Sequence, residues 1–244
     1  MPRIFITGSA DGLGLAAARN LSNQGHAVVV HVRNEQRLDA VHDLLSGSTR
    51  AVIGDLSDLE QTSAIADQVN RIGRMDAIIH NAGVFSGLHV LPVNIVAPYI
   101  LTALITRPAR LIYLSSGMHR SGRPLLDNLD WTGRRSTGSY SDSKLFVTAL
   151  SAAIARRWPD VVSSAVDPGW VPTKMGGPNA PDDLRLGHLT QEWLATSAAP
   201  EALVSGAYWH HQRRIAAHPA AGDVSFQDEL LATLADVTGI ALPS

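Results

Sequence analysis

Tyr140 and Lys144 are the two residues whose types and spacing most directly indicate chemistry. The sequence predicts a long helix over residues 140–158, ended by Pro159, and positions four apart on a helix share one face. A neighbouring ammonium group favours the phenolate and should lower the pKa of Tyr140 from about 10 toward neutrality. Such a tyrosine could act as a general acid or base. The alternative is a solvated surface pair.

A glycine-rich segment near the N-terminus is the second chemical candidate. The apolar run Ile4–Ile6 leads into Gly8, Gly12 and Gly14, and a helix-like apolar pattern follows from Leu15. This order predicts a strand, a tight turn and the N-terminus of a helix. The N–H groups at a helix N-terminus carry partial positive charge, so the turn suits a phosphate. Taken alone, the motif is also compatible with an ordinary turn.

Alternating apolar segments place both candidates in an α/β fold. Strands are predicted at residues 3–6, 27–32, 50–55, 76–80, 109–114, 161–166 and 205–209. Helices are predicted at residues 15–24, 35–45, 57–72, 140–158 and 228–237. This alternation indicates one domain over residues 1–244, with a doubly wound parallel sheet flanked by helices on both faces. Ligands of such sheets bind beyond the carboxyl ends of the strands, so the polar stretches 117–139 and 173–195 are predicted as substrate-side loops.

Composition excludes several classes of function. The 244 residues are 45% hydrophobic and carry a formal net charge of −2, which argues against a nucleic-acid surface and a polybasic membrane anchor. Cysteine is absent, so disulfides and thiolate metal sites are excluded, and the ten histidines show no metal-ligand pattern. No apolar run reaches membrane-spanning length, and the first strand leaves no room for a signal peptide. We therefore expect a cytoplasmic protein.

The segments Thr7-Gly8-x3-Gly12-x-Gly14 and Tyr140-x3-Lys144 resemble the motifs of the short-chain dehydrogenase/reductase family. The resemblance extends over nearly the whole chain, in the same order. It implies a Rossmann-type fold and an oxidoreductase that transfers a hydride between a nicotinamide cofactor and a small carbonyl or alcohol substrate. The segment 115–119, with the long insert that follows it, is similar to the retinol-dehydrogenase-like and carbonyl-reductase-like branches.

The resemblance implies four catalytic residues: Asn94, Ser116, Tyr140 and Lys144. Tyr140 would donate a proton in reduction or accept one in oxidation, and Ser116 would hydrogen-bond the carbonyl oxygen, where negative charge develops. Lys144 would lower the pKa of the tyrosine and bind the nicotinamide ribose. Asn94 would hold a water that links Lys144 to solvent. The alternative for Asn94 is a polar residue that satisfies backbone groups in a helix kink.

The resemblance also implies a cofactor site at the ends of several strands. Asp55-Leu56 resembles an adenine-contacting pair, Asn81-Ala82-Gly83 a segment that steadies the sheet, and Thr173 the contact to the nicotinamide carboxamide. The implied cofactor residues are Gly8, Ser9, Asp11, Gly12, Leu13, Gly14, Arg33, Asp55, Leu56, Asn81, Ala82, Gly83, Tyr140, Lys144, Pro168, Gly169, Val171 and Thr173. His119 and Trp170 are candidates for the substrate pocket, whereas Trp131 and Trp193 are interpreted as packing anchors.

The end of the second predicted strand favours NADP over NAD. NAD enzymes of this fold place an acidic residue there for the ribose hydroxyls, but this chain has Arg33, which can face a 2′-phosphate. The alternative is that Arg33 is an ordinary surface arginine at the end of a strand. Asp11 stands where many NADP-preferring members have a basic residue, which weakens the prediction unless its side chain points away.

The sequence also allows a prediction about how the chain assembles. Three prolines limit the helix between Asn94 and Ser116, and the insert before Tyr140 could cover a helix that often forms the family's dimer interface. We therefore expect a monomer, or a dimer that does not use these helices.

A dinucleotide-binding sensor or regulator without turnover is the main alternative function. A sugar-nucleotide epimerase or dehydratase would have another glycine spacing and a larger C-terminal domain.

Overall fold

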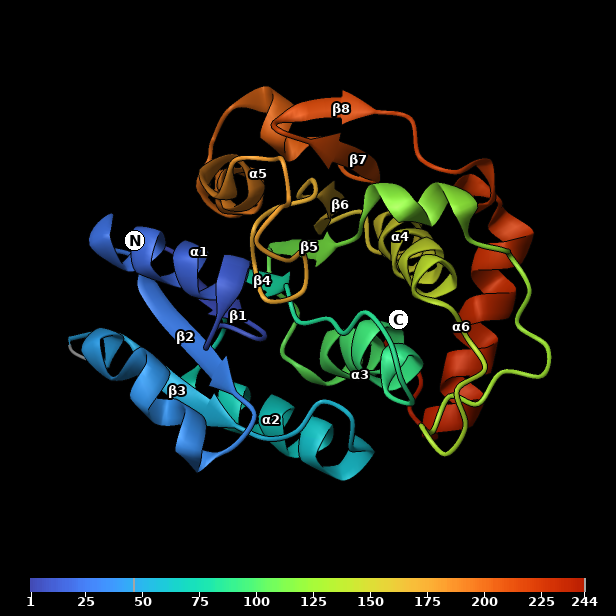
Figure 1. Ribbon diagram of the computed structural model, residues 1–244, viewed down its shortest axis with the longest axis horizontal. Coiled ribbons are helices and arrows are strands. Elements are labelled where there is room, and N and C mark those ends of the chain that lie inside the picture. The colour runs from blue at the N-terminus through green and yellow to red at the C-terminus, as the bar shows by residue number, and fades with distance from the viewer. Residues whose placement is uncertain (46, 244) are drawn as a thin grey trace.

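The computed structural model describes residues 1–45 and 47–243. Over these residues the chain forms one eight-stranded sheet in the order β3-β2-β1-β4-β5-β6-β7-β8 (Figure 1). Neighbouring strands are parallel, except that β8 pairs antiparallel with β7. The strands are β1 (Arg3–Ile6), β2 (Ala27–Val32), β3 (Arg50–Ile53), β4 (Ala77–His80), β5 (Arg110–Leu114), β6 (Val162–Asp167), β7 (Ala207–His210) and β8 (Arg213–Ile215). The predicted doubly wound α/β fold is confirmed.

Helices cover both faces of the sheet (Figure 1). One core contains residues of α1 (Gly12–Asn23), the 3₁₀ helix η1 (Glu35–Leu44) and α5 (Leu184–Thr196). The other contains residues of α2 (Leu59–Ile72), α3 (Ala97–Leu104), α4 (Tyr140–Arg157) and α6 (Val224–Thr238). Shorter turns are the π-helical η2 (Pro92–Val96) and the 3₁₀ segments η3 (Gly117–Ser121), η4 (Pro200–Leu203) and η5 (Pro219–Gly222).

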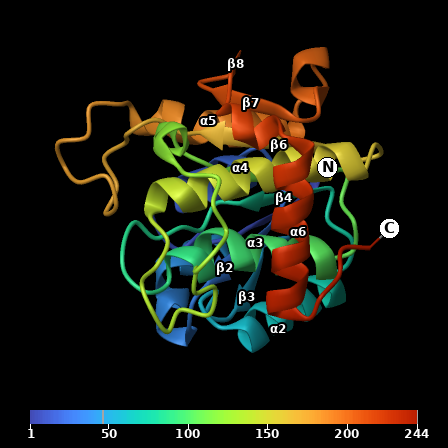
Figure 2. The same ribbon diagram turned by 90° about the vertical axis from the view of Figure 1, so that its right-hand side faces the viewer.

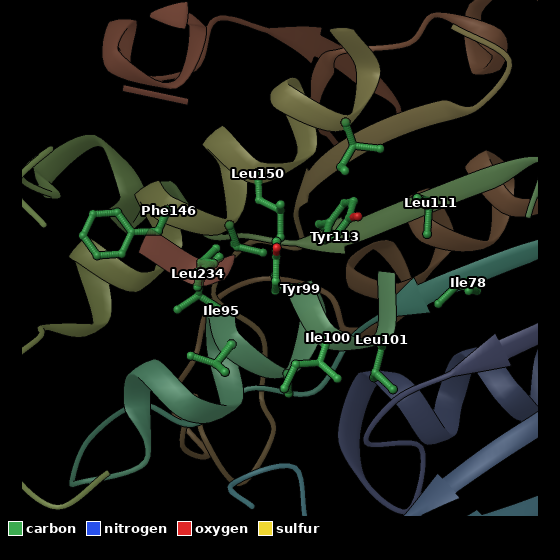
Figure 3. Packing of buried hydrophobic residues seen from close by; sticks show 14 of the residues in the cluster. Ile78, Ile95, Tyr99, Ile100, Leu101, Leu111, Tyr113, Phe146, Leu150 and Leu234 are labelled. Atoms are coloured by element: carbon green, nitrogen blue, oxygen red, sulfur yellow. The ribbon is translucent and has the colours of Figure 1, made fainter. Parts of the chain in front are cut away.

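Side-chain alternation explains why the strands are almost continuously apolar. In β1, Phe5 enters one core while Ile4 and Ile6 enter the other, so a strand covered on both faces has no solvent-facing position. Figure 3 shows the larger core, where Tyr99 of α3 and Leu234 of α6 both contribute. The Tyr99 hydroxyl donates a hydrogen bond to the Ile240 carbonyl at 2.7 Å, which ties the C-terminal segment to α3.

Helix α4 is enclosed by later and earlier parts of the chain. Phe226 of α6 lies 6.0 Å from Phe146 of α4 between ring centroids, and Trp131 of the insert lies 5.7 Å from the same phenylalanine. Figure 2 shows α6 crossing α4 and α3 on this side of the molecule. The interpretation of Trp131 as a packing anchor agrees with its 5% exposure.

Several element boundaries differ from the sequence predictions. The stretch 173–195 was expected as a loop, but its second half is α5, where Gly187 allows contact with Val171 and Leu13: a Cβ there would lie 2.7 and 3.0 Å from their side chains. Such packing between distant segments leaves no local signal. The helix predicted at residues 35–45 is the 3₁₀ helix η1 (Glu35–Leu44) instead of an α-helix, and the edge strand β8 was missed.

Prolines shape the short helix before β5. Pro92 opens the π-helical turn η2, and Pro98 is the second residue of α3. Because η2 runs directly into the eight residues of α3, Pro98 lies inside a continuous helical segment and leaves one helical hydrogen bond unmade. Among the described residues, none of the helices has the length and apolarity to cross a bilayer.

Candidate active site and cofactor cleft

A cleft of about 670 Å³ opens at the carboxyl ends of the parallel strands. Most of the sequence-predicted site residues line it: Gly8, Asp11, Gly12, Leu13, Arg33, Asp55, Leu56, Asn81, Ala82, Gly83, Tyr140, Lys144, Pro168 and Thr173. Ser9, Gly14, Asn94, Ser116, Gly169, Val171, His119 and Trp170 are not among the lining residues. The described residues contain no group of His, Asp and Glu side chains arranged to hold a metal ion.

The glycine turn is built against the end of β4. Gly8 has a φ of +63°, and a Cβ there would lie 2.9 Å from the Ala82 Cα. The Thr7 hydroxyl accepts a hydrogen bond from the Ala82 N–H at 3.0 Å, and the Asn81 amide donates to the Thr7 carbonyl at 2.9 Å. The turn therefore leaves the backbone open toward the cleft, at the N-terminus of α1, as a phosphate requires.

His31 in β2 supports this turn and was missed by the sequence analysis. Its Nδ1 accepts a hydrogen bond from the Gly8 N–H at 3.0 Å, so its Nε2 carries the proton and donates to the Gly54 carbonyl at 2.9 Å. Burial lowers the pKa of His31, which favours this neutral form. Ser9 accepts from the His31 N–H at 2.7 Å, so Ser9 is a support for the turn rather than part of the cleft wall. A histidine inside an apolar strand was the available signal.

Tyr140 begins α4 and faces the segment that follows β5. Ser139 and Asp142 form a reciprocal capping box, which fixes the start of the helix and thus the position of the tyrosine. The Ser116 side chain lies close enough to the Tyr140 hydroxyl to lower its pKa, although burial has the larger, opposite effect. Ser115 is buried instead, with its hydroxyl 2.7 Å from that of Thr148.

Lys144 lies beneath Tyr140, with its Nζ 5.4 Å from the centre of the phenol ring. The ammonium group donates to the Leu114 carbonyl at 2.7 Å and is only 4% exposed. Burial lowers the pKa of Lys144 to about 8 and raises that of Tyr140 to about 12. The sequence prediction of a lowered tyrosine pKa is wrong for this structure. Burial of the phenol, rather than the nearby Lys144, dominates the pKa of Tyr140. Burial also disfavours the charged form of Lys144 itself.

Asn94 occupies the π-helical turn η2, a feature often found at functional sites. Its Oδ1 accepts from the Val84 N–H at 2.8 Å, and its Nδ2 donates to the Val84 carbonyl and the Ser143 hydroxyl at 2.9 Å each. A Cβ at Gly83 would lie 3.4 Å from both the Asn94 Oδ1 and the Lys144 Nζ. Asn94 thus satisfies backbone groups beside a helix irregularity, and both Asn94 and Lys144 approach Gly83.

The segment after β6 closes one side of the cleft. Gly169 has a φ of +81°, and the Asp182 carboxylate accepts a hydrogen bond from the Trp170 N–H at 2.6 Å, which holds the turn from across the loop. The Thr173 methyl group lies against Gly12, 3.4 Å from the position of a Cβ. The loop therefore packs directly on the glycine turn.

The two candidates for the substrate pocket lie in different surroundings. Trp170 is 60% exposed, and its indole N–H donates to the Gly176 carbonyl. His119 is fully buried: its Nδ1 lies 2.8 Å from the Ser116 carbonyl, and its Nε2 accepts from the His218 N–H at 3.0 Å. It braces the chain after Ser116 and does not reach the cleft. Phe85, half exposed with its ring 4.9 Å from that of Tyr140, was missed by the sequence analysis.

Three positive side chains line the cleft near the carboxyl end of β2. Arg33 is exposed there, and Arg37 and Lys174 line the same cleft, although neither was selected from the sequence. Both contact the Asp11 carboxylate, at 3.5 Å from Arg37 and 2.5 Å from Lys174. The hydrogen bond from Lys174 is the main cause of the lowered pKa of Asp11. Asp11 is therefore ionised and paired.

Comparisons with known proteins agree with this arrangement. A family model described as short chain dehydrogenase matches residues 2–107. Short-chain dehydrogenase chry4 of Gibberella zeae is 37% identical, with 100% of both chains covered. Retinol dehydrogenase 13 of Homo sapiens is 26% identical, with 99% of this chain and 86% of that protein covered. A blue fluorescent protein from a metagenomic library, in complex with NADPH, has a TM-score of 0.71 at 20% identity, with 86% of this chain and 95% of that chain covered. The chain belongs to the short-chain dehydrogenase/reductase family of oxidoreductases.

Proposed function

We propose that this oxidoreductase uses NADP(H) to transfer a hydride between the nicotinamide and a carbonyl or alcohol substrate, with Tyr140 as the general acid or base. The observation that carries the proposal is that one cleft is lined both by the glycine turn and by the Tyr140–Lys144 pair. The NADPH complex of a structural neighbour and the retinol dehydrogenase relative support the cofactor and substrate classes.

The residues around Tyr140 fit carbonyl reduction. When bound, the cofactor supplies the hydride chemistry, and the protein positions and polarises the carbonyl. Ser116 donates a hydrogen bond to the carbonyl oxygen as negative charge develops there, and Tyr140 gives that oxygen its proton. Because the pKa of Tyr140 is about 12, the phenol is protonated at neutral pH and ready to act as an acid. Lys144 stabilises the phenolate that remains.

The pH dependence should report the protonation of Lys144. Below a pH of about 8 its ammonium group is charged and stabilises the phenolate; as the pH rises through 8 the charge is lost, and kcat for reduction should fall. Tyr140 stays protonated over the same range. Measuring kcat against pH at saturating NADPH for the native protein and for Lys144→Arg checks this. Arginine keeps its charge, so an unchanged fall near pH 8 in that variant would contradict the assignment.

NADP is proposed as the preferred nucleotide because of Arg33. The arginine is exposed at the end of β2 and lines the cleft, so its guanidinium can form a charge-assisted, bidentate contact with a 2′-phosphate. The same position lacks the acidic side chain that would bind the ribose hydroxyls of NAD.

For assembly we propose a monomer, or a dimer that does not use α3 and α4. The insert and α6 both pack on Phe146 of α4, so a face of that helix available in many relatives is covered here by the chain itself. Size-exclusion chromatography with light scattering should give the mass of one or two chains of 244 residues. A stable tetramer would contradict the proposal.

The decisive test of function is the loss of NADPH absorbance with a panel of aldehydes, ketones and quinones. Turnover of any of them supports the proposed reductase. NADPH binding without turnover across the whole panel would favour a dinucleotide-binding sensor. The retention of Asn94, Ser116, Tyr140 and Lys144 argues for turnover, because a sensor has no need of the acid and its partners.

A further inference from the structure

One carboxylate in the cleft holds two cations from distant parts of the chain. Asp11, in the glycine turn, contacts Arg37 of η1 and Lys174 of the loop after β6. Arg37 also donates to the Ala10 carbonyl at 3.3 Å, which keeps its guanidinium over the turn. All three charged side chains line the cleft together with Arg33.

The two cations reverse the sign of the charge expected around Asp11. An isolated carboxylate at the N-terminus of α1 would occupy the positive field that a phosphate uses and would repel a phosphate. With Arg37 and Lys174 beside it, the group of three carries a net positive charge. The other charged groups of the cleft are Arg33, Asp55 and Lys144, and Asp55 is engaged by the N–H and hydroxyl of Ser57.

These ion pairs are exposed enough to exchange partners. The side chain of Lys174 is 77% exposed and that of Arg37 38%, so the pairs contribute little to stability. Because both nitrogens reach the same carboxylate oxygen, a single phosphate beside Asp11 can contact both. The carboxylate then serves to hold the two cations in place before the phosphate binds.

We propose that Lys174 and Arg37, positioned by Asp11, complete with Arg33 a binding site for the 2′-phosphate of NADPH. The inference rests on the proposed use of NADP(H) and extends it, because it assigns phosphate recognition to the loop after β6. The basic residue missing from the glycine turn is supplied by a segment more than 160 positions later in the chain. Since Lys174 follows Thr173, which packs on Gly12, phosphate binding also holds this substrate-side loop against the turn.

Binding measurements without turnover test this site. Lys174→Met and Arg37→Met should each weaken NADPH binding about tenfold in isothermal titration calorimetry, as expected for the loss of a charge-assisted contact. NADH binding should stay within about twofold, because NADH lacks the 2′-phosphate. Arg19→Met is the matched control: it removes one positive charge from α1, where Arg19 pairs with Asp43, and it should bind both nucleotides as the native protein does.

Titration with 2′,5′-ADP and with 5′-ADP separates this inference from the proposed function. Selective loss of 2′,5′-ADP binding in the two variants supports the site even if no carbonyl substrate is found. Unchanged NADPH binding in both variants would overturn it. Equal losses for NADPH and NADH would overturn it as well, because the cations would then serve a group common to both nucleotides.

Discussion

Replacement of Tyr140 by Phe should lower kcat for carbonyl reduction by about 10²- to 10⁴-fold, the usual contribution of a positioned acid. The phenol lines the cleft beside Ser116, and with a pKa of about 12 it has a proton to give at neutral pH. Phenylalanine keeps the ring beside Phe85 and removes only the hydroxyl. NADPH affinity should therefore change little. Stopped-flow or steady-state NADPH oxidation gives kcat, and calorimetry gives the affinity.

Tyr99→Phe is the matched control for this substitution. Tyr99 is a buried tyrosine of α3 whose hydroxyl donates to the Ile240 carbonyl, and it does not line the cleft. The same loss of one hydroxyl should leave kcat within about twofold, because that hydroxyl lies outside the cleft. A Tyr140→Phe protein with a near-native rate would mean that another group delivers the proton, and the proposed mechanism would then be wrong.

The parts of the site that were predictable depend on the backbone. Gly8 and Gly14 are required by contacts with Ala82 and Asn81, and the spacing of Tyr140 and Lys144 follows from one helical turn. Such patterns can be read from the sequence because each of these residue types is required by the geometry of the backbone around it. They led to the fold, to the glycine turn and to the cleft residues that cluster in the structure.

The parts that were not predictable depend on which segments meet in space. The direction of the Tyr140 pKa shift follows from burial, and the sequence shows only that Lys144 is four positions away. Asp11 was expected to oppose a phosphate, but its partners come from η1 and from the loop after β6. His119 was a candidate for the substrate pocket, and its burial against Tyr208 depends on the placement of β7.

Replacement of Gly14 by Ala should destabilise the protein and weaken NADPH binding by at least about tenfold, although helix propensity alone predicts a gain of up to about 1 kcal/mol. A Cβ at this position would lie 2.4 Å from the Asn81 Nδ2 and 2.6 Å from the Gly8 carbonyl oxygen. Backbone cannot yield as a flexible side chain does, so the clash should cost about 1–3 kcal/mol. The same displacement breaks the hydrogen bond from Asn81 to Thr7 that shapes the phosphate turn.

The sign of the stability change shows whether the clash or the helix propensity dominates at Gly14, and Gly222 provides the reference. A Cβ at Gly222 would have nothing within 4 Å, so Gly222→Ala should stay within about 0.5 kcal/mol of the native protein. Thermal unfolding of both variants measures the difference, and Gly14→Ala should lower Tm by several degrees. A Gly14→Ala protein as stable as the native one, with unchanged NADPH affinity, would show that the contact between the turn and Asn81 is not what holds the cofactor cleft in shape.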